Sequence, residues 1–307
     1  MKNIEILSSE DITREILKDY NSYNNLFVNT QSFFLSLMYK RYKSLERGNV
    51  VLFFSKENQK SILRLKDYDF FHDISLIKFW ENNELVEHRK WSIGNISTEI
   101  NLPKETTRRN ILYLINQKIL GNKKKTICFL PSEHYKNNYN KSIEEEINTL
   151  INLIQFVLKK LDFLIEKEDI KKEIKKNFSF YWFHFLEVQI KYLKEWKKSF
   201  GDLELLLISK QCSEIYLKNI KSEVVNVIIN ITDISKNTGI PRATCLRKLE
   251  KLEKLGGIAQ NNKTKRYFMS SNHLDSSQIA KKDKMFDTIK LYSNFFYTCV
   301  KALALKA

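Results

Sequence analysis

The sequence predicts a mostly helical protein in which one short structural unit occurs twice, each copy followed by a small β-hairpin. Helix-breaking residues are scarce, since the 307 residues include only three prolines and seven glycines. In addition, residues 93–126 and 231–264 share nine identities at a constant offset of 138 positions. An offset of that length is far longer than the period of a solenoid and indicates duplication of a whole domain.

Size and charge narrow the class of protein. A chain of this length forms about two domains of ordinary size. Its 43% hydrophobic residues, with 20 Phe and 14 Tyr, supply substantial cores. The net charge of +16 and the pI near 9.4 favour a polyanionic partner. The excess of Lys, Asn and Ile is also typical of AT-rich genomes, so charge alone does not choose among DNA, RNA and an acidic membrane.

Cysteine usage and hydropathy predict the compartment. The four cysteines are isolated, with no CxxC and no zinc-ligand spacing, which favours a reduced intracellular setting. Residues 1–16 lack the apolar core of a signal peptide. No stretch approaches the roughly 18 apolar residues that a membrane helix needs. We therefore expect a cytoplasmic protein that does not contact a membrane.

The expected domains follow the repeat. We predict a polar, loosely held arm over residues 1–25, a first domain over 26–172 with a trailing helix, and a second domain over 173–307. The charged run KKEIKK at 171–176 is the expected junction between the two domains.

Helices are expected on both sides of each repeat, because apolar residues recur at helical spacing there. The helix over 178–200 is apolar nearly all round, which predicts that it is buried. A long helix follows the hairpin in both halves, so the duplicated unit includes that helix. In chain order the expected elements are a helix around 26–47, a strand or core-entering loop over 50–54, an amphipathic helix over 142–166 capped by Ser142, the aromatic helix over 178–200, and a closing helix from Met285 to Val300.

The second copy carries the clearer motif. Thr232 is expected to cap a short helix that turns Ile234 inward, and Gly239 supplies the left-handed residue that ends this helix. Pro241 opens the next helix, where its missing N–H costs nothing. An apolar stripe of Cys245, Leu249 and Leu252, with Leu255 as an uncertain member, faces inward. The opposite face is free to enter a major groove and consists of Arg242, Ala243, Thr244, Arg247, Lys248 and Lys251.

A basic hairpin follows this helix. Gly256 and Gly257 end the helix, and two short strands are expected over 258–260 and 267–269. A basic hairpin directly after a cationic helix can hold phosphates or the adjacent minor groove. Its cations are Lys263, Lys265 and Arg266.

The order of helix, tight turn, helix and hairpin resembles the winged helix-turn-helix of the MarR and IclR families of bacterial transcription regulators. The likeness rests on the Ile-Pro turn, on a Thr followed three residues later by Arg, and on the Leu-x-x-Leu-x-x-x-Gly run. The resemblance implies two tandem winged helix-turn-helix domains joined by long amphipathic helices. It also implies that Arg242, Ala243, Thr244 and Arg247 face DNA, with Lys263, Lys265 and Arg266 on the wing.

The first copy departs from this pattern. Asn101 replaces the turn glycine and tolerates left-handed geometry better than most residues. Lys118 replaces the glycine that ends the second helix, so this helix either runs longer or ends at Gly121. Glu105 is unusual opposite phosphates, and it either accepts from a cytosine amine or weakens DNA binding by this copy. The candidate DNA-binding residues here are Lys104, Thr106, Arg108 and Arg109 on the helix and Lys123, Lys124 and Lys125 on the hairpin.

Enzyme motifs are missing from the sequence. It contains no GxxxxGK[ST], GxGxxG, HExxH or GxSxG. The five histidines are isolated, and the acidic run Glu144–Glu146 is typical of a helix start rather than of a metal site. We expect a protein without enzymatic activity, cofactor or metal.

These observations favour a sequence-specific double-stranded DNA-binding protein, with transcription regulation implied by the resemblance; they identify no small-molecule effector. We expect the two halves to pack through residues 142–200 and 280–305 as a single-chain pseudo-dimer, with a homodimer as the alternative. The two reading helices would then address major-groove faces about 34 Å apart. The rival functions are a plasmid- or phage-type replication initiator, a nucleoid-associated or single-strand-binding protein, and a non-enzymatic protein-interaction scaffold.

Overall fold

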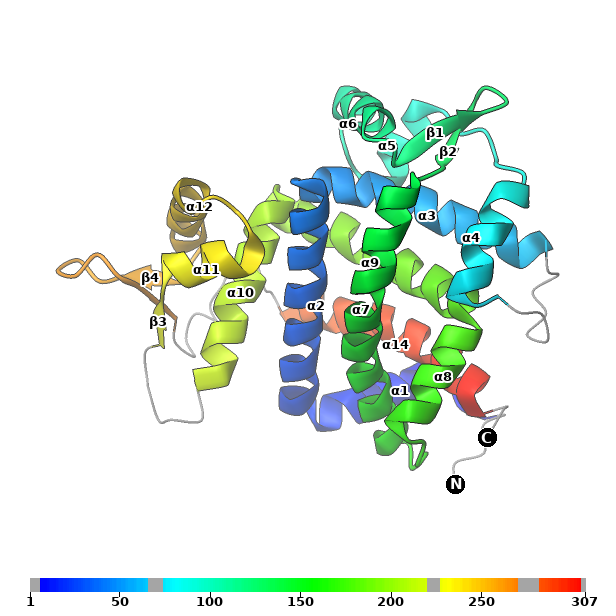
Figure 1. Ribbon diagram of the computed structural model, residues 1–307. Coiled ribbons are helices and arrows are strands. Elements are labelled where there is room, and N and C mark those ends of the chain that lie inside the picture. Colours follow the sequence, from blue (N-terminus) through cyan, green and yellow to red (C-terminus); the bar gives the residue numbers. More distant parts are fainter. Residues whose placement is uncertain (1–5, 66–73, 220–226, 270–281, 305–307) are drawn as a thin grey trace. The chain divides into compact units, whose positions relative to one another are not determined.

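The computed structural model describes residues 6–65, 74–219, 227–269 and 282–304 (Figure 1). Over these residues the protein is mostly helical, with two small antiparallel sheets, as the sequence predicts. The helices are α1 (Ser9–Lys18), α2 (Tyr20–Tyr42), α3 (Leu45–Leu65), α4 (Leu76–Leu85), α5 (Ile93–Ile100), α6 (Lys104–Asn116), α7 (Glu133–Lys160), α8 (Lys167–Lys176), α9 (Phe178–Phe200), α10 (Leu203–Asn219), α11 (Ile231–Thr238), α12 (Arg242–Lys254) and α14 (Lys282–Ala304). The strands are β1 (Leu120–Lys123), β2 (Thr126–Phe129), β3 (Val227–Ile229), β4 (Ala259–Gln260) and β5 (Tyr267–Met269).

The chain forms two compact units, and each contains one copy of the repeat. Unit 1 comprises Met1–Lys18, Glu46–Lys194 and Lys290–Ala307, and unit 2 comprises Asp19–Leu45 and Glu195–Ile289. Both units combine segments that are distant in sequence. They therefore do not coincide with the consecutive ranges, 26–172 and 173–307, that the repeat alone leads one to expect.

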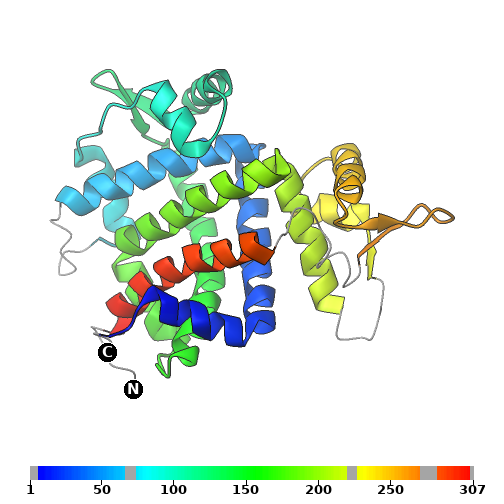
Figure 2. The same ribbon diagram turned by 180° about the vertical axis from the view of Figure 1, so that it is seen from behind.

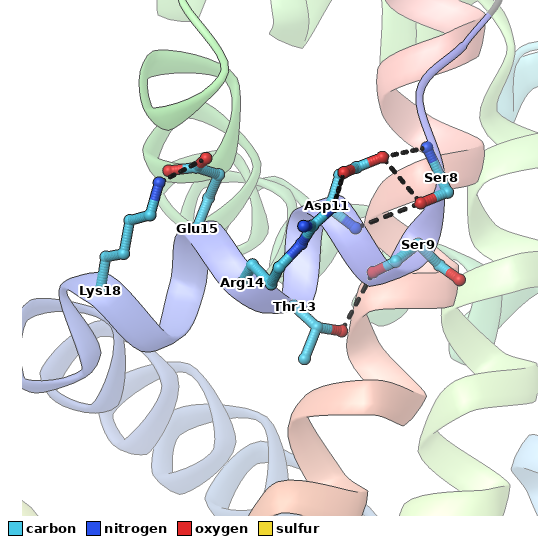
Figure 3. Close-up of polar contacts among 7 residues, drawn as sticks. All are labelled: Ser8, Ser9, Asp11, Thr13, Arg14, Glu15 and Lys18. Atoms are coloured by element: carbon cyan, nitrogen blue, oxygen red, sulfur yellow. Dashed lines mark hydrogen bonds and ion pairs between the residues drawn. The ribbon is translucent and has the colours of Figure 1, made fainter.

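The N-terminal segment is helical from Ser9 onward, so the prediction of a loosely held arm over residues 1–25 is wrong for its described part. Ser8 and Asp11 cap α1 reciprocally (Figure 3). The Asp11 carboxylate accepts from the Ser8 N–H at 2.9 Å, and the Asp11 N–H donates to the Ser8 hydroxyl oxygen at 3.2 Å. Ile12 and Ile16, one helical turn apart, are fully buried. This apolar pair anchors a segment whose overall composition is polar.

Residues 50–54 lie within α3, so the prediction of a strand or core-entering loop over these residues is wrong. All five side chains, Val50 to Phe54, are buried. A helical stretch that is apolar on every face is buried on every face. The spacing of its apolar residues does not distinguish it from a short buried strand.

The long helix α7 begins at Glu133 and ends at Lys160, so its predicted bounds of 142–166 are shifted. Its N-cap is Ser132, whose hydroxyl oxygen accepts from the Tyr135 N–H at 3.4 Å. Ser142, the predicted cap, lies inside the helix and donates to the Tyr139 carbonyl. The first turns of α7 are rich in Asn, Lys and Tyr, and hydropathy alone gave no signal for a helix there.

The charged run at 171–176 forms most of α8, so it is not a linker. Ile170 and Ile174 bury the inner face of this helix. Lys171 and Lys175 both pair with Glu144 of α7. Glu144, which the sequence predicted at the start of a helix, therefore lies inside α7 and links it to α8.

The aromatic helix α9 has the predicted bounds, Phe178 to Phe200. In unit 1 the rings of Phe178 and Trp182 stack with centroids 5.2 Å apart. Tyr192 meets Tyr292 of α14 edge to face at 6.0 Å. The closing helix α14, orange to red in Figure 2, includes the predicted range 285–300.

In unit 2, α10 packs against α2, α11, α12 and β3. A set of polar side chains connects α2 to α10 by hydrogen bonds. The Ser32 hydroxyl donates to the Glu214 carboxylate, and the Gln211 amide donates to the same carboxylate at 3.2 Å. Asn237 of α11 donates to the Gln211 amide oxygen at 3.3 Å, which connects the repeat to these helices.

Candidate nucleic-acid interface

The first copy of the repeat, in unit 1, consists of α5, α6 and the β1–β2 hairpin (Figure 1). Ser92 caps α5 by accepting from the Asn95 N–H at 3.1 Å. Asn101 adopts the left-handed conformation with φ 52°, as predicted, and its N–H donates to the Ser97 carbonyl. Pro103 is the N-cap of α6.

The second copy, in unit 2, has the same order: α11, α12 and the β4–β5 hairpin. Its short helix is capped by Asn230, whose side-chain oxygen accepts from the Thr232 N–H at 2.9 Å, so the prediction of Thr232 as the cap is wrong. Gly239 has φ 76° and ends α11, as predicted. Pro241 is the N-cap of α12.

The duplication extends to backbone geometry. Both short helices have eight residues and both following helices have thirteen. The Ser97 hydroxyl donates to the Leu102 carbonyl at 2.5 Å, and the equivalent Ser235 hydroxyl donates to the Ile240 carbonyl at 2.7 Å. The two prolines have φ/ψ of −56°/141° and −55°/140°. One retained serine thus ties the same turn in each copy.

The ends of α6 and α12 also match, although one residue is ill suited to its position. Lys118 has φ 54° where the equivalent Gly256 has φ 75°. The N–H of the next residue closes the helix end in the same way in both copies. Ile119 donates to the Leu114 carbonyl and Gly257 donates to the Leu252 carbonyl, each at 3.0 Å. Helix α6 therefore ends at Asn116 and neither runs longer nor ends at Gly121. A lysine in this conformation costs about 1–2 kcal/mol that a glycine avoids.

The first hairpin has a two-residue turn made of two lysines. Lys123 pairs with Thr126 at the end of the ladder, which leaves Lys124 and Lys125 to make the turn. Their φ values of 49° and 61° are both left-handed. A type I′ turn requires this at both positions and strongly prefers Asn-Gly. Two exposed cations therefore occupy positions where lysine is strained.

The second hairpin is organised by Asn261. Its N–H donates to the Arg266 carbonyl at 2.9 Å, and its side-chain oxygen accepts from the N–H groups of Lys263 and Thr264. All six residues from Asn261 to Arg266 are exposed. The tip points away from α11 and α12 in Figures 1 and 2. Sequence reasoning missed β3, which pairs with β5 and makes this sheet three-stranded, in the order β3-β5-β4.

The exposed face of α12 carries most of the predicted contact residues. Cys245, Leu249 and Leu252 are buried as predicted. Arg242, Ala243 and Arg247 are exposed, and Thr244 is half-buried. Within the part of the chain that the structure describes, neither Arg242 nor Arg247 has an ion-pair partner. The same holds for Lys263, Lys265 and Arg266 of the hairpin.

Lys248 was predicted as a DNA contact, but it is held inside the unit. Its ammonium pairs with the Asp202 carboxylate and lies 3.7 Å from that of Glu204, and its side chain is 15% exposed. Asp202 also caps α10 by accepting from the N–H groups of Glu204 and Leu205. Burial raises the Asp202 pKa, but the hydrogen bond and charge of Lys248, together with the N–H donors of Leu205 and Glu204, outweigh burial and hold it below its ordinary value. Lys248 therefore fixes α12 to the start of α10.

The exposed face of α6 carries its own counter-charge. Lys104 is exposed and Thr106 is half-buried. The Glu105 carboxylate accepts from Nε and Nη2 of Arg108 at 2.9 and 2.8 Å, and Arg109 Nε lies 3.8 Å from it. The hydrogen bond from Arg108 is the main cause of a lowered Glu105 pKa. Both predicted arginines of this copy are therefore partly neutralised.

Of the three lysines predicted at the first hairpin, two point to solvent. Lys124 and Lys125 are exposed. Lys123 is half-buried and its ammonium donates to the Glu84 carbonyl. The free cations of this hairpin are thus the two strained residues of its turn.

One further cation was missed by sequence reasoning. Lys40, near the end of α2, is exposed. Its Cγ lies 3.0 Å from where a Cβ on Gly239 would be, which places it beside the turn that precedes α12. No local pattern connects two residues so far apart in sequence. A side chain at position 239 would press on Lys40, and its main cost would be the left-handed φ of 76°.

Comparisons with known protein families, with curated proteins and with solved structures return no match to this chain. Among the helices that the structure describes, none is both long and apolar enough to cross a membrane. The described residues also contain no group of three or more His, Cys, Asp or Glu side chains placed to hold a metal ion.

Proposed function

We propose that this chain is a sequence-specific double-stranded DNA-binding protein of the winged helix-turn-helix type. In this proposal α6 and α12 enter the major groove and the two hairpins act as wings. The observation that carries it is the second copy's set of exposed cations, which have no carboxylate partner among the residues that the structure describes. They are Arg242, Arg247, Lys263, Lys265 and Arg266.

The dimensions of these elements suit a duplex. A thirteen-residue helix is about 20 Å long, and the major groove is wide enough to admit an α-helix. Arg109 and Arg247 occupy equivalent positions in the two copies, and both are exposed. We assign base-edge contact to these two arginines and phosphate contact to the hairpin cations.

The strained turn of the first hairpin supports the same function. Left-handed geometry for a residue other than glycine costs of order 1–3 kcal/mol and is frequent at functional sites. At Lys124 and Lys125 the strain keeps two ammonium groups at the tip of a hairpin. Phosphate binding is the function that such a tip serves best.

Transcription regulation is the role we favour within this class, on the resemblance to MarR and IclR regulators. One chain carries both reading helices, and their exposed faces differ. A single chain acting as a pseudo-dimer therefore recognises an asymmetric site. A replication initiator with two winged helices makes the same contacts but binds repeated sites at an origin, so the bound sequences distinguish the two roles.

The experiment measures binding of the full chain to a pool of random duplexes, with selection of bound sequences and a salt titration. Each phosphate neutralised contributes about 0.9 to the slope of log affinity against log salt. Arg247→Ala is expected to cost about 1–3 kcal/mol at the selected site and to relax base choice. The matched control is Lys172→Ala, which removes an exposed charge from α8. The proposal is wrong if duplex affinity is absent or does not depend on salt.

A further inference from the structure

The exposed faces of α6 and α12 carry different charges near the first turn of each helix. Glu105 of the first copy corresponds to Ala243 of the second, and Arg108 corresponds to Leu246. Leu246 is 40% exposed beside Arg247, and the described residues place no carboxylate against that arginine. In the first copy Glu105 binds Arg108 through two hydrogen bonds and lies near Arg109.

Opening this pair costs little, because an ion pair between exposed side chains contributes little to stability. Glu105 and Arg108 have exposed side-chain fractions of 58% and 50%. DNA can therefore separate Arg108 from Glu105 readily. The larger cost comes afterwards, because the carboxylate left behind lies in the first turn of α6, where an approaching phosphate repels it.

A desolvated carboxylate without a donor is unfavourable, whereas a carboxylate that accepts from a base edge is not. In the major groove, cytosine presents only an amine donor, its N4 group, and Glu or Asp is its usual partner. A guanine edge presents acceptors in the same place and repels the carboxylate. Glu105 can thus penalise most sequences and tolerate those with a cytosine at the start of α6.

We infer that Glu105 is a specificity-determining residue, which restricts the first copy to duplex sites with a cytosine opposite the first turn of α6. The second copy, with Ala243 in place of the glutamate, supplies affinity with less base preference. This inference rests on the proposed function. It gives the two copies different tasks on one duplex site.

An acidic residue in the first turn also stabilises a helix through the dipole, so a purely structural role makes a different prediction. Glu105→Gln keeps the size of the side chain and removes its charge. If its role is structural, this variant lowers the melting temperature and leaves base preference unchanged. The reciprocal variant, Ala243→Glu, installs the same carboxylate on the second copy.

The test measures the affinity of the full-length protein and its variants for two kinds of duplex. One is random duplex, and the other is the selected site with each of the four bases in turn opposite the first turn of α6. For Glu105→Gln we expect random-duplex affinity to rise several-fold and the preference for cytosine to fall about tenfold or more. For Ala243→Glu we expect weaker random-duplex binding. Circular dichroism melting confirms that each variant is folded.

The outcomes separate the two proposals. Salt-dependent duplex binding with unchanged base preference in Glu105→Gln overturns the role of Glu105 and leaves the proposed function intact. A rise in affinity that is equal for all sequences also overturns it, because a general charge effect then suffices. Failure of the wild-type chain to bind any duplex overturns the proposed function and, with it, this inference.

Discussion

The ammonium of Lys248 is held by Asp202, the same carboxylate that caps α10, and so a lysine from the predicted reading helix is a structural residue. Its neighbour Arg247 is exposed and has no ion-pair partner within the described chain. Two adjacent cations of one helix therefore have different surroundings.

This relationship predicts opposite effects of two neighbouring substitutions. Lys248→Ala leaves the Asp202 carboxylate, whose side chain is 24% exposed, without its cation and should lower the free energy of unfolding by about 1–3 kcal/mol. Arg247→Ala should leave that free energy within about 0.5 kcal/mol and weaken duplex binding. Urea unfolding and fluorescence anisotropy measure the two quantities. A loss of DNA affinity in Lys248→Ala beyond that of Lys172→Ala would contradict the assignment.

Lys210 predicts a pH dependence of stability. Its ammonium lies 5.0 Å from the Trp196 ring centroid and 5.8 Å from that of Phe27, while Lys284 lies 5.6 Å from the same Trp196 ring. Burial lowers the pKa of Lys210 to about 8. The unfolded chain, with a lysine pKa near 10.4, binds more protons between these values. Stability should therefore rise with pH from about 8 to 10.4.

Lys210→Met is the variant that isolates this effect. Methionine fills the same space without a charge, so we expect it to stabilise the fold by about 1–3 kcal/mol at neutral pH. It should also remove the rise in stability above pH 8. The control is Lys218→Met on the same helix, where the lysine is exposed and pairs with Glu214. Melting curves at pH 7, 8.5 and 10 provide the measurement, and an unchanged pH profile in Lys210→Met would refute the prediction.

Lys118→Gly should stabilise the first copy. It relieves left-handed strain at the end of α6, at the expense of some backbone entropy, for a net gain of about 0.5–1 kcal/mol. Asn116→Gly, at the last residue of the same helix, is the matched control and should destabilise slightly. Thermal unfolding of both variants tests the sign, and destabilisation by Lys118→Gly would show that the turn is not strained.

The turn of the first hairpin allows stability and function to be separated. Lys124→Asn with Lys125→Gly matches the preferred type I′ turn, so the melting temperature should rise. The same variant removes two cations and should reduce the salt slope by about 1.8. Replacing both lysines by alanine should weaken binding equally without the gain in stability. Unchanged duplex affinity in both variants would remove this hairpin from the interface.

Much of the repeat was predictable because its signals are local. Gly239, Asn101 and the two prolines fix turns through their own backbone preferences, and the structure confirms them. The bounds of α9 also followed from its continuous aromatic face. What failed depends on tertiary context. Residues 50–54 are too short for period to separate a buried strand from a buried helix, and the start of α7 is too polar to show an apolar stripe.

The candidate site shows the same division. Exposure of Arg242 and Arg247 followed from helical period, whereas the partner of Lys248 is Asp202, 46 positions away and just before the start of α10. The proximity of Lys40 to Gly239 is a long-range contact that no local pattern encodes. The contact between Glu105 and Arg108 lies within one turn and could have been inferred from spacing.

The shared serine-to-carbonyl hydrogen bonds and the equal helix lengths give α6 and α12 the same backbone framework. Residues 104–113 and 242–251 enter and leave through the same backbone geometry, and their buried positions face inward at the same register. Transplanting one decapeptide onto the other scaffold should therefore leave the fold intact and, on the proposed function, should carry the base preference of that helix face with it.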